Sequence, residues 1–334
     1  MSSSMRTKFL EEVFAGQSEK TANAFYVKWM QIEAVEKEIG KTIEDGLCEE
    51  NYILFLSKFK SRTVVSFYVL KSAIMRYMRW LLEKGYIDAQ KLDAMAALRF
   101  EDVPLDDEDY SRKFFKDFDS LRETVESMIL IAIDEYGVID EARYDTEVAA
   151  IYLSWFGVSQ EDICKIEKRD LTDSGVMVNG KEVYLPDFVS DFLKKYAVSE
   201  GFQQQSRGLM MRKYTSTSYL LRTCKTKNDM LSVTNLRTSI SHFSEIYNKY
   251  QKENDDGKDN KKGHQLNLST IYWSGIYSRA YEYECENGLI QPFDYDTIKK
   301  IFGETYDQDR FVANKRLRSY QAYKKVFHLE DPKT

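Results

Sequence analysis

The sequence predicts a mainly α-helical protein of two helical domains, the second of which carries a small β-hairpin. Apolar residues recur at helical spacing along most of the 334 residues, and only 4 Pro and 15 Gly interrupt them. The 23 Tyr and 19 Phe supply bulky side chains for two cores, which a chain of this length can hold. One strong turn signal, Asn179-Gly180, lies between the short runs VMV and KEVYLP and predicts the hairpin.

The first domain is expected over residues 21–103, after a polar tail over residues 1–20 that we expect to fray. Gly40 and Gly85 end two of its helices. The apolar spacing predicts helices over residues 21–39, 46–60, 64–84 and 89–98. Pro104 and the acidic residues that follow it predict a linker over residues 104–109.

The second domain is expected over residues 110–330. Ser159 is a candidate N-cap, because Glu161 and Asp162 place acidic side chains in the first turn that follows. The charged, low-complexity stretch 251–263 is expected to be a flexible loop. The expected helices are 110–135, 147–155, a short one after Ser159, one opening at Pro186-Asp187, 231–250, 266–286, 296–302 and 311–327.

Composition excludes several classes of function. The net charge of −6 argues against a general polyanion binder, so any nucleic-acid surface must be a local basic patch. The 4 Cys are scattered without a CxxC pair and there are only 3 His, so we expect no metal site and a reducing compartment. No cofactor motif, signal peptide or membrane-spanning run is found, and we expect a cytoplasmic protein without a cofactor.

Two basic stretches contain no acidic residue, and both are candidate DNA-binding surfaces. Such stretches are often solvated helix faces, but one-sided charge in an otherwise acidic chain favours contact with phosphates. The first stretch, 57–80, contains Lys58, Lys60, Arg62, Lys71, Arg76 and Arg79. The second stretch, 201–228, contributes Arg207, Arg212, Lys213, Arg222 and Lys225.

The stretch Asp145–Tyr196 reads as helix, turn, helix, hairpin, helix, and this order resembles the catalytic domain of tyrosine recombinases, the phage integrase family. In that family the turn reads roughly T-G-L-R-x-S-E-L, and here the same slot is Phe156-Gly157-Val158-Ser159-Gln160-Glu161-Asp162-Ile163. The helices of residues 20–100 likewise resemble the family's core-binding domain. The resemblance implies a two-domain, tyrosine-recombinase-like architecture and double-stranded DNA as the partner.

The resemblance also implies a tyrosine nucleophile surrounded by cations, because the transition state of phosphoryl transfer carries distributed negative charge. Ser159 occupies the slot of the first arginine. Lys181, after the hairpin turn, matches the hairpin lysine and is also a candidate phosphate contact. Tyr320 and Tyr323 are the candidates for the nucleophile.

The second motif, H-x-L-R-H-T, aligns best with the stretch that begins at Ser274. Ser274 then replaces the first histidine and Tyr277 replaces the arginine. A third motif, L-G-H, aligns with Phe302-Gly303-Glu304, where Glu304 replaces the histidine. An alternative alignment instead uses Arg237 and His264, but it leaves a long chain after His264 and still lacks an arginine at Ser159.

These losses predict a catalytically inactive, recombinase-like DNA-binding protein, with no catalytic residue, that acts as a phage or prophage repressor or regulator. Two alternatives stay open: a divergent active integrase that cleaves through Tyr320 or Tyr323, and a helical interaction scaffold without a DNA role. A regulatory protein or peptide partner is also left open, as is the oligomeric state.

Overall fold

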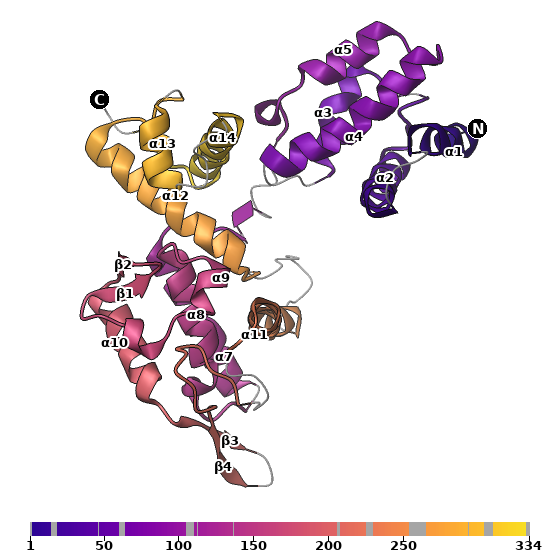
Figure 1. The fold of residues 1–334 in the computed structure, drawn as a ribbon. Helices are drawn as coiled ribbons and strands as arrows, with labels where there is room; N and C mark the ends of the chain where they lie inside the picture. The colour runs from indigo at the N-terminus through magenta and orange to yellow at the C-terminus, as the bar shows by residue number, and fades with distance from the viewer. Residues whose placement is uncertain are drawn as a thin grey trace. The chain divides into compact units, whose positions relative to one another are not determined.

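The computed structural model describes most of the chain as helices, and the prediction of a mainly α-helical protein with a small β-hairpin is confirmed (Figure 1). The described residues are 2–14, 19–45, 47–59, 64–104, 110–111, 113–135, 137–205, 208–224, 230–253, 265–292, 294–303 and 310–331. Contacts divide the chain into two compact units. The first comprises Met1–Tyr110 and Gln308–Leu329, and the second comprises Ser111–Asp307 and Glu330–Thr334.

The first unit is all helical. Its elements are α1 (Ser2–Phe14), α2 (Glu19–Ile39), η1 (Glu49–Asn51), α3 (Tyr52–Ser57), α4 (Val64–Glu83), α5 (Ala89–Ala97), η2 (Phe100–Asp102) and α14 (Arg310–Val326). The Asp88 side chain caps α5 by accepting from the Lys91 backbone N–H. Helix α4 packs against α2, α5 and α14, so its inward side forms the centre of this core.

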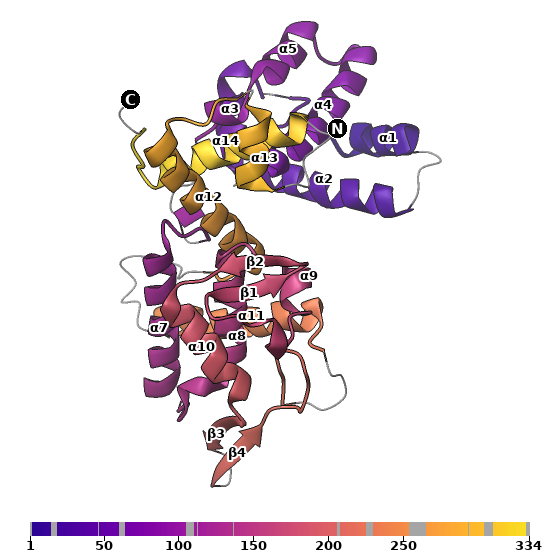
Figure 2. The ribbon, with the colours of Figure 1, turned by 60° about the vertical axis from the view of Figure 1, so that its left-hand side comes forward.

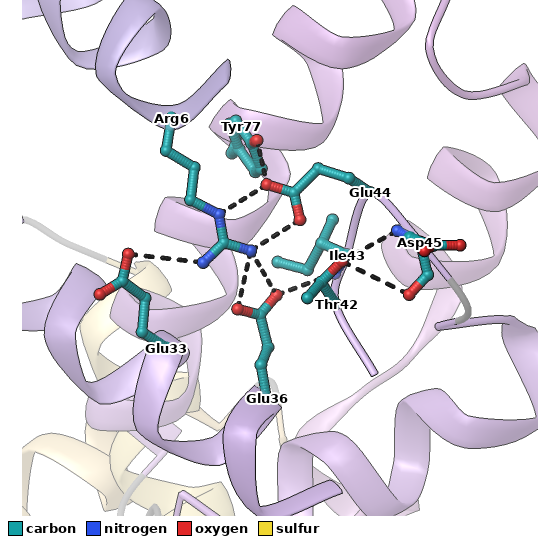
Figure 3. Close-up of polar contacts among 8 residues, drawn as sticks. All are labelled: Arg6, Glu33, Glu36, Thr42, Ile43, Glu44, Asp45 and Tyr77. Atoms are coloured by element: carbon teal, nitrogen blue, oxygen red, sulfur yellow. Dashed lines mark hydrogen bonds and ion pairs between the residues drawn. The ribbon is translucent and has the colours of Figure 1, made fainter. Parts of the chain in front are cut away.

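The N-terminal residues are not a frayed tail, because α1 is part of the core of the first unit. Phe9 is fully buried and its ring lies 4.9 Å from Tyr77 and 5.9 Å from Trp29. Arg6 is also buried, and its guanidinium contacts Glu36 at 2.8 Å and Glu44 at 2.6 Å (Figure 3). The sequence prediction considered only the polarity of residues 1–20 and missed that one phenylalanine and one arginine anchor them.

Figure 3 also shows how this buried network joins elements that are distant in the sequence. Tyr77 of α4 donates to the Glu44 carboxylate, and the backbone N–H of Ile43 donates to Glu36 over 2.8 Å. A buried charge is stabilised only when it is paired and hydrogen-bonded. Arg6 therefore holds α1, α2 and the segment around Glu44 in one arrangement.

The second unit contains the remaining helices and two separate two-stranded antiparallel sheets, β1–β2 and β3–β4. Its elements are α7 (Phe118–Asp134), η3 (Glu141–Tyr144), α8 (Asp145–Trp155), α9 (Gln160–Ile163), η4 (Lys168–Asp170), β1 (Gly175–Val178), β2 (Lys181–Tyr184), α10 (Asp187–Val198), β3 (Gly201–Gln205), β4 (Leu209–Lys213), α11 (Val233–Glu253), α12 (Leu268–Asn287) and α13 (Tyr295–Phe302).

Helix α8 is the central element of the second unit. Every residue from Val148 to Trp155 is buried, so the helix is apolar around its whole circumference, as expected for a core helix. It contacts η3, α9, α10, α11 and α12. Figures 1 and 2 both show it inside the second unit. The α8–turn–α9–hairpin–α10 order is the one predicted for Asp145–Tyr196.

The structure differs from the sequence prediction in several places. Helix α7 begins at Phe118 rather than at residue 110, because Asp117 caps it by accepting from the Ser120 backbone N–H over 2.8 Å. The β3–β4 hairpin was not predicted. Helix α14 groups by contacts with the first unit, although the sequence assigned residues 110–330 to one domain. Of the predicted loop 251–263, residues 251–253 end α11 and the others lie outside the described residues.

Candidate nucleic-acid interface

The outward face of α4 presents two of the predicted DNA-binding arginines side by side. Arg76 and Arg79 are exposed and lie one helical turn apart. The same face carries Ser72 before them and Glu83 after them, both also exposed. This face is a short basic segment that is open to solvent, as a phosphate contact requires.

Two other lysines predicted for this surface have structural partners instead. Lys71 is only 7% exposed, and its ammonium donates to the carbonyl oxygens of Ala96, over 2.7 Å, and Leu98. Burial lowers the pKa of Lys71. Lys58 is exposed but forms an ion pair of 2.7 Å with Glu38. The Lys71 charge is therefore used to cap the end of α5, which argues against the predicted contact with DNA.

The second basic stretch, 201–228, likewise contains both exposed cations and a cation that has internal partners. Arg212 and Lys213 of β4 are exposed. Arg222 is only 5% exposed, stacks over the Tyr214 ring at 4.6 Å and donates to the carbonyl oxygens of Ser199, over 2.8 Å, and Tyr196. The Arg222 guanidinium joins α10 to the segment that follows β4, which argues against the predicted contact with DNA.

The β1–β2 hairpin has the predicted turn, with Asn179 and Gly180 both at positive φ. Lys181 opens β2, pairs with Val178 and is exposed. Ser159 is the N-cap of α9: its hydroxyl accepts from the Asp162 backbone N–H and donates to the Asp162 carboxylate over 2.7 Å. At the position of the family's first arginine, the Ser159 hydroxyl therefore caps α9.

Ser274 and Tyr277 lie in the core of the second unit. Ser274 is fully buried, accepts from the Phe115 backbone N–H over 3.1 Å and donates to the Thr270 carbonyl oxygen over 2.7 Å. Tyr277 is 2% exposed, and its ring packs against Phe114 and Phe302. Neither residue is presented to a ligand in this arrangement.

Tyr320 and Tyr323 are fully buried in α14. The Lys324 ammonium lies 5.3 Å from the centre of the Tyr320 ring, and the Tyr323 ring lies 4.9 Å from Phe327. Helix α14 belongs by contacts to the first unit, whereas Lys181 belongs to the second. A buried phenol in a packed helix has no access to a phosphodiester.

Two arginines that the preferred alignment did not use lie against the α8–α9 turn. Arg279 of α12 donates from Nη1 to the Trp155 carbonyl oxygen over 2.8 Å. Arg237 of α11 donates from Nε to the Gln160 side chain over 2.6 Å, and its Nη2 lies 3.9 Å from the Glu161 carboxylate. Arg237 is the arginine that the alternative alignment placed in the second motif.

The environment of Arg279 differs from that of Arg237. Burial lowers the pKa of Arg279, and the nearby Glu282 and Tyr272 oppose this change. A β-carbon at Gly157 would lie 3.2 Å from Arg279 Nη2, so the glycine leaves room for the guanidinium. Arg237 is more exposed, with 59% of its side chain accessible. Arg279 therefore stabilises the turn from inside, and Arg237 lies on its surface.

Several predicted site residues lie outside the described residues. They are Lys60, Arg62, Arg207, Lys225, Glu304 and His264. In the part of the chain that the structure describes, no group of three or more His, Cys, Asp or Glu side chains could hold a metal ion. None of the described helices combines the length and the apolar composition needed to cross a membrane.

Comparison with known proteins gives one distant likeness. No family model and no curated protein matches the chain. The chain is similar to a lambda integrase fragment dimer bound to a COC′ core site, with 13% identity, a TM-score of 0.41 and coverage of 99% of this chain and 98% of that one. It is also similar to a lambda integrase dimer bound to a COC′ core site, with 14% identity, a TM-score of 0.42 and coverage of 98% and 79%. These values describe a distant likeness of fold.

Proposed function

We propose that this chain is a DNA-binding protein of tyrosine-recombinase-like architecture that does not cleave DNA and that regulates transcription in a phage or prophage. The observation that carries the proposal is that Ser274 and Tyr277 are both buried. Both side chains take part in core packing and hydrogen bonding where the preferred alignment requires cations around a phosphate. Such a regulator would act in the cytoplasm of a bacterial host.

Binding to a duplex needs fewer features than cleavage does. Lysine and arginine side chains that neutralise phosphates supply most of the affinity, and they need exposure rather than a closed catalytic site. Arg76 and Arg79 on α4 and Arg212 and Lys213 on β4 meet this requirement. Lys181, at the start of β2, is a further exposed cation.

A second candidate is an active, divergent recombinase, and the position of Arg237 favours it. Arg237 contacts α9 next to Ser159, so the alternative alignment brings one arginine of the second motif to the predicted turn. Arg279 reaches the same turn from α12 and lies near the Tyr272 phenol. An arginine near a tyrosine, with a second arginine at the same turn, could support phosphoryl transfer if the tyrosine hydroxyl were accessible.

The first experiment measures binding of the full chain to random-sequence duplexes at several salt concentrations. Charge reversal of both Arg76 and Arg79 to Glu should weaken binding across all sequences. Lys37→Glu, at an exposed site in the last turn of α2, is the control for reversal of a single charge elsewhere on the first unit. Unchanged binding by the double variant would remove α4 from the interface, and no binding by the wild type would favour a scaffold without a DNA role.

The second experiment separates the regulator from the recombinase. Covalent protein–DNA adducts are sought after incubation with the duplexes that the wild type selects. The regulator gives no adduct. An adduct that disappears in Tyr320→Phe, Tyr323→Phe or Tyr272→Phe would overturn the proposal of inactivity and identify the nucleophile.

A further inference from the structure

The β3–β4 hairpin is a narrow ribbon that projects from the second unit, and both ribbon views show it at the end of that unit (Figures 1 and 2). Its register pairs Phe202 with Arg212, Gln203 with Met211 and Gln205 with Leu209. Within the described residues, β4 pairs only with β3. The ribbon is therefore accessible along β4, where every residue is exposed.

The base of the ribbon is firmly attached. The Gln203 backbone N–H donates to the Asp140 carboxylate over 2.6 Å. Phe202 is buried, and its ring lies 5.9 Å from Tyr214 and 5.7 Å from the Arg143 guanidinium. A β-carbon at Gly201 would lie 2.0 Å from the Arg212 carbonyl oxygen, so only glycine permits this pairing. These contacts fix the ribbon's direction and leave its outer part free to meet a ligand.

The two faces of the ribbon differ because side chains alternate along a strand. One face holds Phe202, which is buried at the base, and Arg212, which donates from Nε to Gln204 over 2.9 Å. The other, which we name the amide face, is exposed along its whole length. Its residues are Gln203, Gln205, Leu209, Met211 and Lys213.

The chemistry of the amide face fits an A·T base pair. A glutamine amide can accept from adenine N6 and donate to adenine N7, and an apolar side chain can contact the thymine methyl group. Gln203 lies opposite Met211, and Gln205 lies opposite Leu209, so each cross-strand pair combines one amide with one apolar side chain. Lys213 on the same face supplies a charge for a neighbouring phosphate.

Charge and size favour a duplex over a protein strand as the occupant. Residues 201–228 contain no acidic side chain, which matches a polyanion. The major groove is about 12 Å wide and admits a two-stranded ribbon. Leu209 and Met211 of the amide face are 63% and 50% exposed, and their apolar surface gains contact when it meets the methyl groups in that groove.

We propose that the β3–β4 ribbon enters the major groove and that its amide face reads A·T base pairs. This proposal rests on the proposed function as a DNA-binding protein. It assigns sequence preference to Gln203, Gln205 and Met211, and it leaves sequence-independent affinity to the exposed arginines and lysines elsewhere.

The test uses the full chain and a pool of random-sequence duplexes. The wild type should enrich duplexes that share A·T positions, and replacing thymine by deoxyuridine at those positions should weaken binding several-fold, because only the major-groove methyl group is lost. Gln203→Ala with Gln205→Ala should reduce the preference for enriched over random duplexes by at least about tenfold, while binding to random duplexes persists. Gln204→Ala, on the opposite face, is the matched control.

Three outcomes would overturn the proposal. The first is a wild type whose preference among duplexes is unchanged when thymine is replaced by deoxyuridine. This comparison needs no variant, so it decides even if the double variant fails to fold. The second is a change of oligomeric state in the double variant without a change in DNA preference, which would make the ribbon a protein interface. The third is a wild type that binds no duplex, which would also overturn the proposed function.

Discussion

Gly275 of α12 lies directly against the main chain of Trp155 in α8. A β-carbon on Gly275 would lie 1.9 Å from the Trp155 carbonyl oxygen, which is far closer than two atoms can approach without a bond. The same carbonyl oxygen accepts the hydrogen bond from Arg279. The missing side chain therefore brings α12 onto α8 and allows Arg279 to reach the α8–α9 turn.

Gly275→Ala should separate the two helices and destabilise the second unit. Inserting a methyl group into a packed interface typically costs about 1–3 kcal/mol, and contact with backbone places this site at the upper end. Chemical denaturation measures the loss. Ser278→Ala, on the same helix and partly exposed, should change the free energy of unfolding by less than about 0.5 kcal/mol. Equal stability of both variants would contradict the close packing.

Arg6→Met should destabilise the first unit, because it leaves the buried carboxylates of Glu36 and Glu44 without their cation. Breaking a buried ion pair from one side typically costs about 3–5 kcal/mol. The change is followed by the fluorescence of Trp29 and Trp80, which both lie in this unit. Glu33→Gln is the control, since that carboxylate is half exposed and its pair with Arg6 is longer, 3.5 Å.

Adding Glu36→Gln and Glu44→Gln to Arg6→Met should restore part of the lost stability. The two amides remove the uncompensated charges while they keep the size of the side chains. If the triple variant is less stable than Arg6→Met alone, the loss comes from packing around α1 and not from buried charge.

Lys71 and Arg76 should respond in opposite ways, although both belong to the same acid-free stretch. Lys71→Met leaves the carbonyl oxygens of Ala96 and Leu98 without their donor and should cost about 2–3 kcal/mol of stability. Arg76→Ala removes an exposed side chain and should change stability by less than about 0.5 kcal/mol. Thermal unfolding and a duplex-binding assay of both variants separate the two roles: only Arg76→Ala should weaken binding.

This contrast explains which parts of the structure the sequence could predict. The order α8, turn, α9, hairpin and α10 follows from apolar spacing, from the Ser159 cap and from Asn179-Gly180, which are all local signals. The position of a charged side chain is not local. Lys71 and Arg222 are buried by segments that begin more than twenty residues away in the sequence, so counting basic residues could not show that their charges were already used.

Sequence analysis missed other elements for the same reason, because their positions depend on residues far away in the sequence. Nothing in residues 1–20 alone shows that Phe9 fits among Trp29 and Tyr77. The β3–β4 ribbon has weak strand propensity, and the only local signals for it are the glycines at 201 and 208, both at positive φ. Likewise, the contact of Arg237 with Gln160 joins residues 77 positions apart, so no local signal could show it.

Asp145, in the first turn of α8, should make stability fall as the pH rises. Burial raises the pKa of its carboxyl from 3.8 to about 7, although Lys195 partly opposes the change. Between these values the folded protein keeps a proton that the unfolded chain has released, so stability is lost as the pH rises through this window. Because the group is partly exposed, we expect a decrease of about 1–2 kcal/mol rather than the full effect of the shift.

Asp145→Asn should therefore be more stable than the wild type at pH 8 and nearly equal to it at pH 4, as measured by denaturant unfolding at both pH values. Asp187→Asn, at an exposed position in the first turn of α10, is the control for loss of a charge near a helix N-terminus. A wild-type advantage at the higher pH would contradict the sign of the shift.

Arg237→Ala distinguishes a surface ion pair from a phosphate contact. The Arg237 guanidinium holds Gln160 over 2.6 Å and is 3.9 Å from Glu161, and such an exposed pair contributes less than about 1 kcal/mol to stability. If Arg237 also contacts DNA, its loss should reduce the slope of binding affinity against salt concentration by about one phosphate contact, and Arg237→Lys should preserve most of that slope.

Arg169→Ala is the matched control, because Arg169 is more exposed and pairs with Glu167 over 2.7 Å. An unchanged salt slope would leave Arg237 as a structural contact of α9, whereas loss of a covalent adduct with retained affinity would show that the turn still holds a working phosphoryl-transfer site.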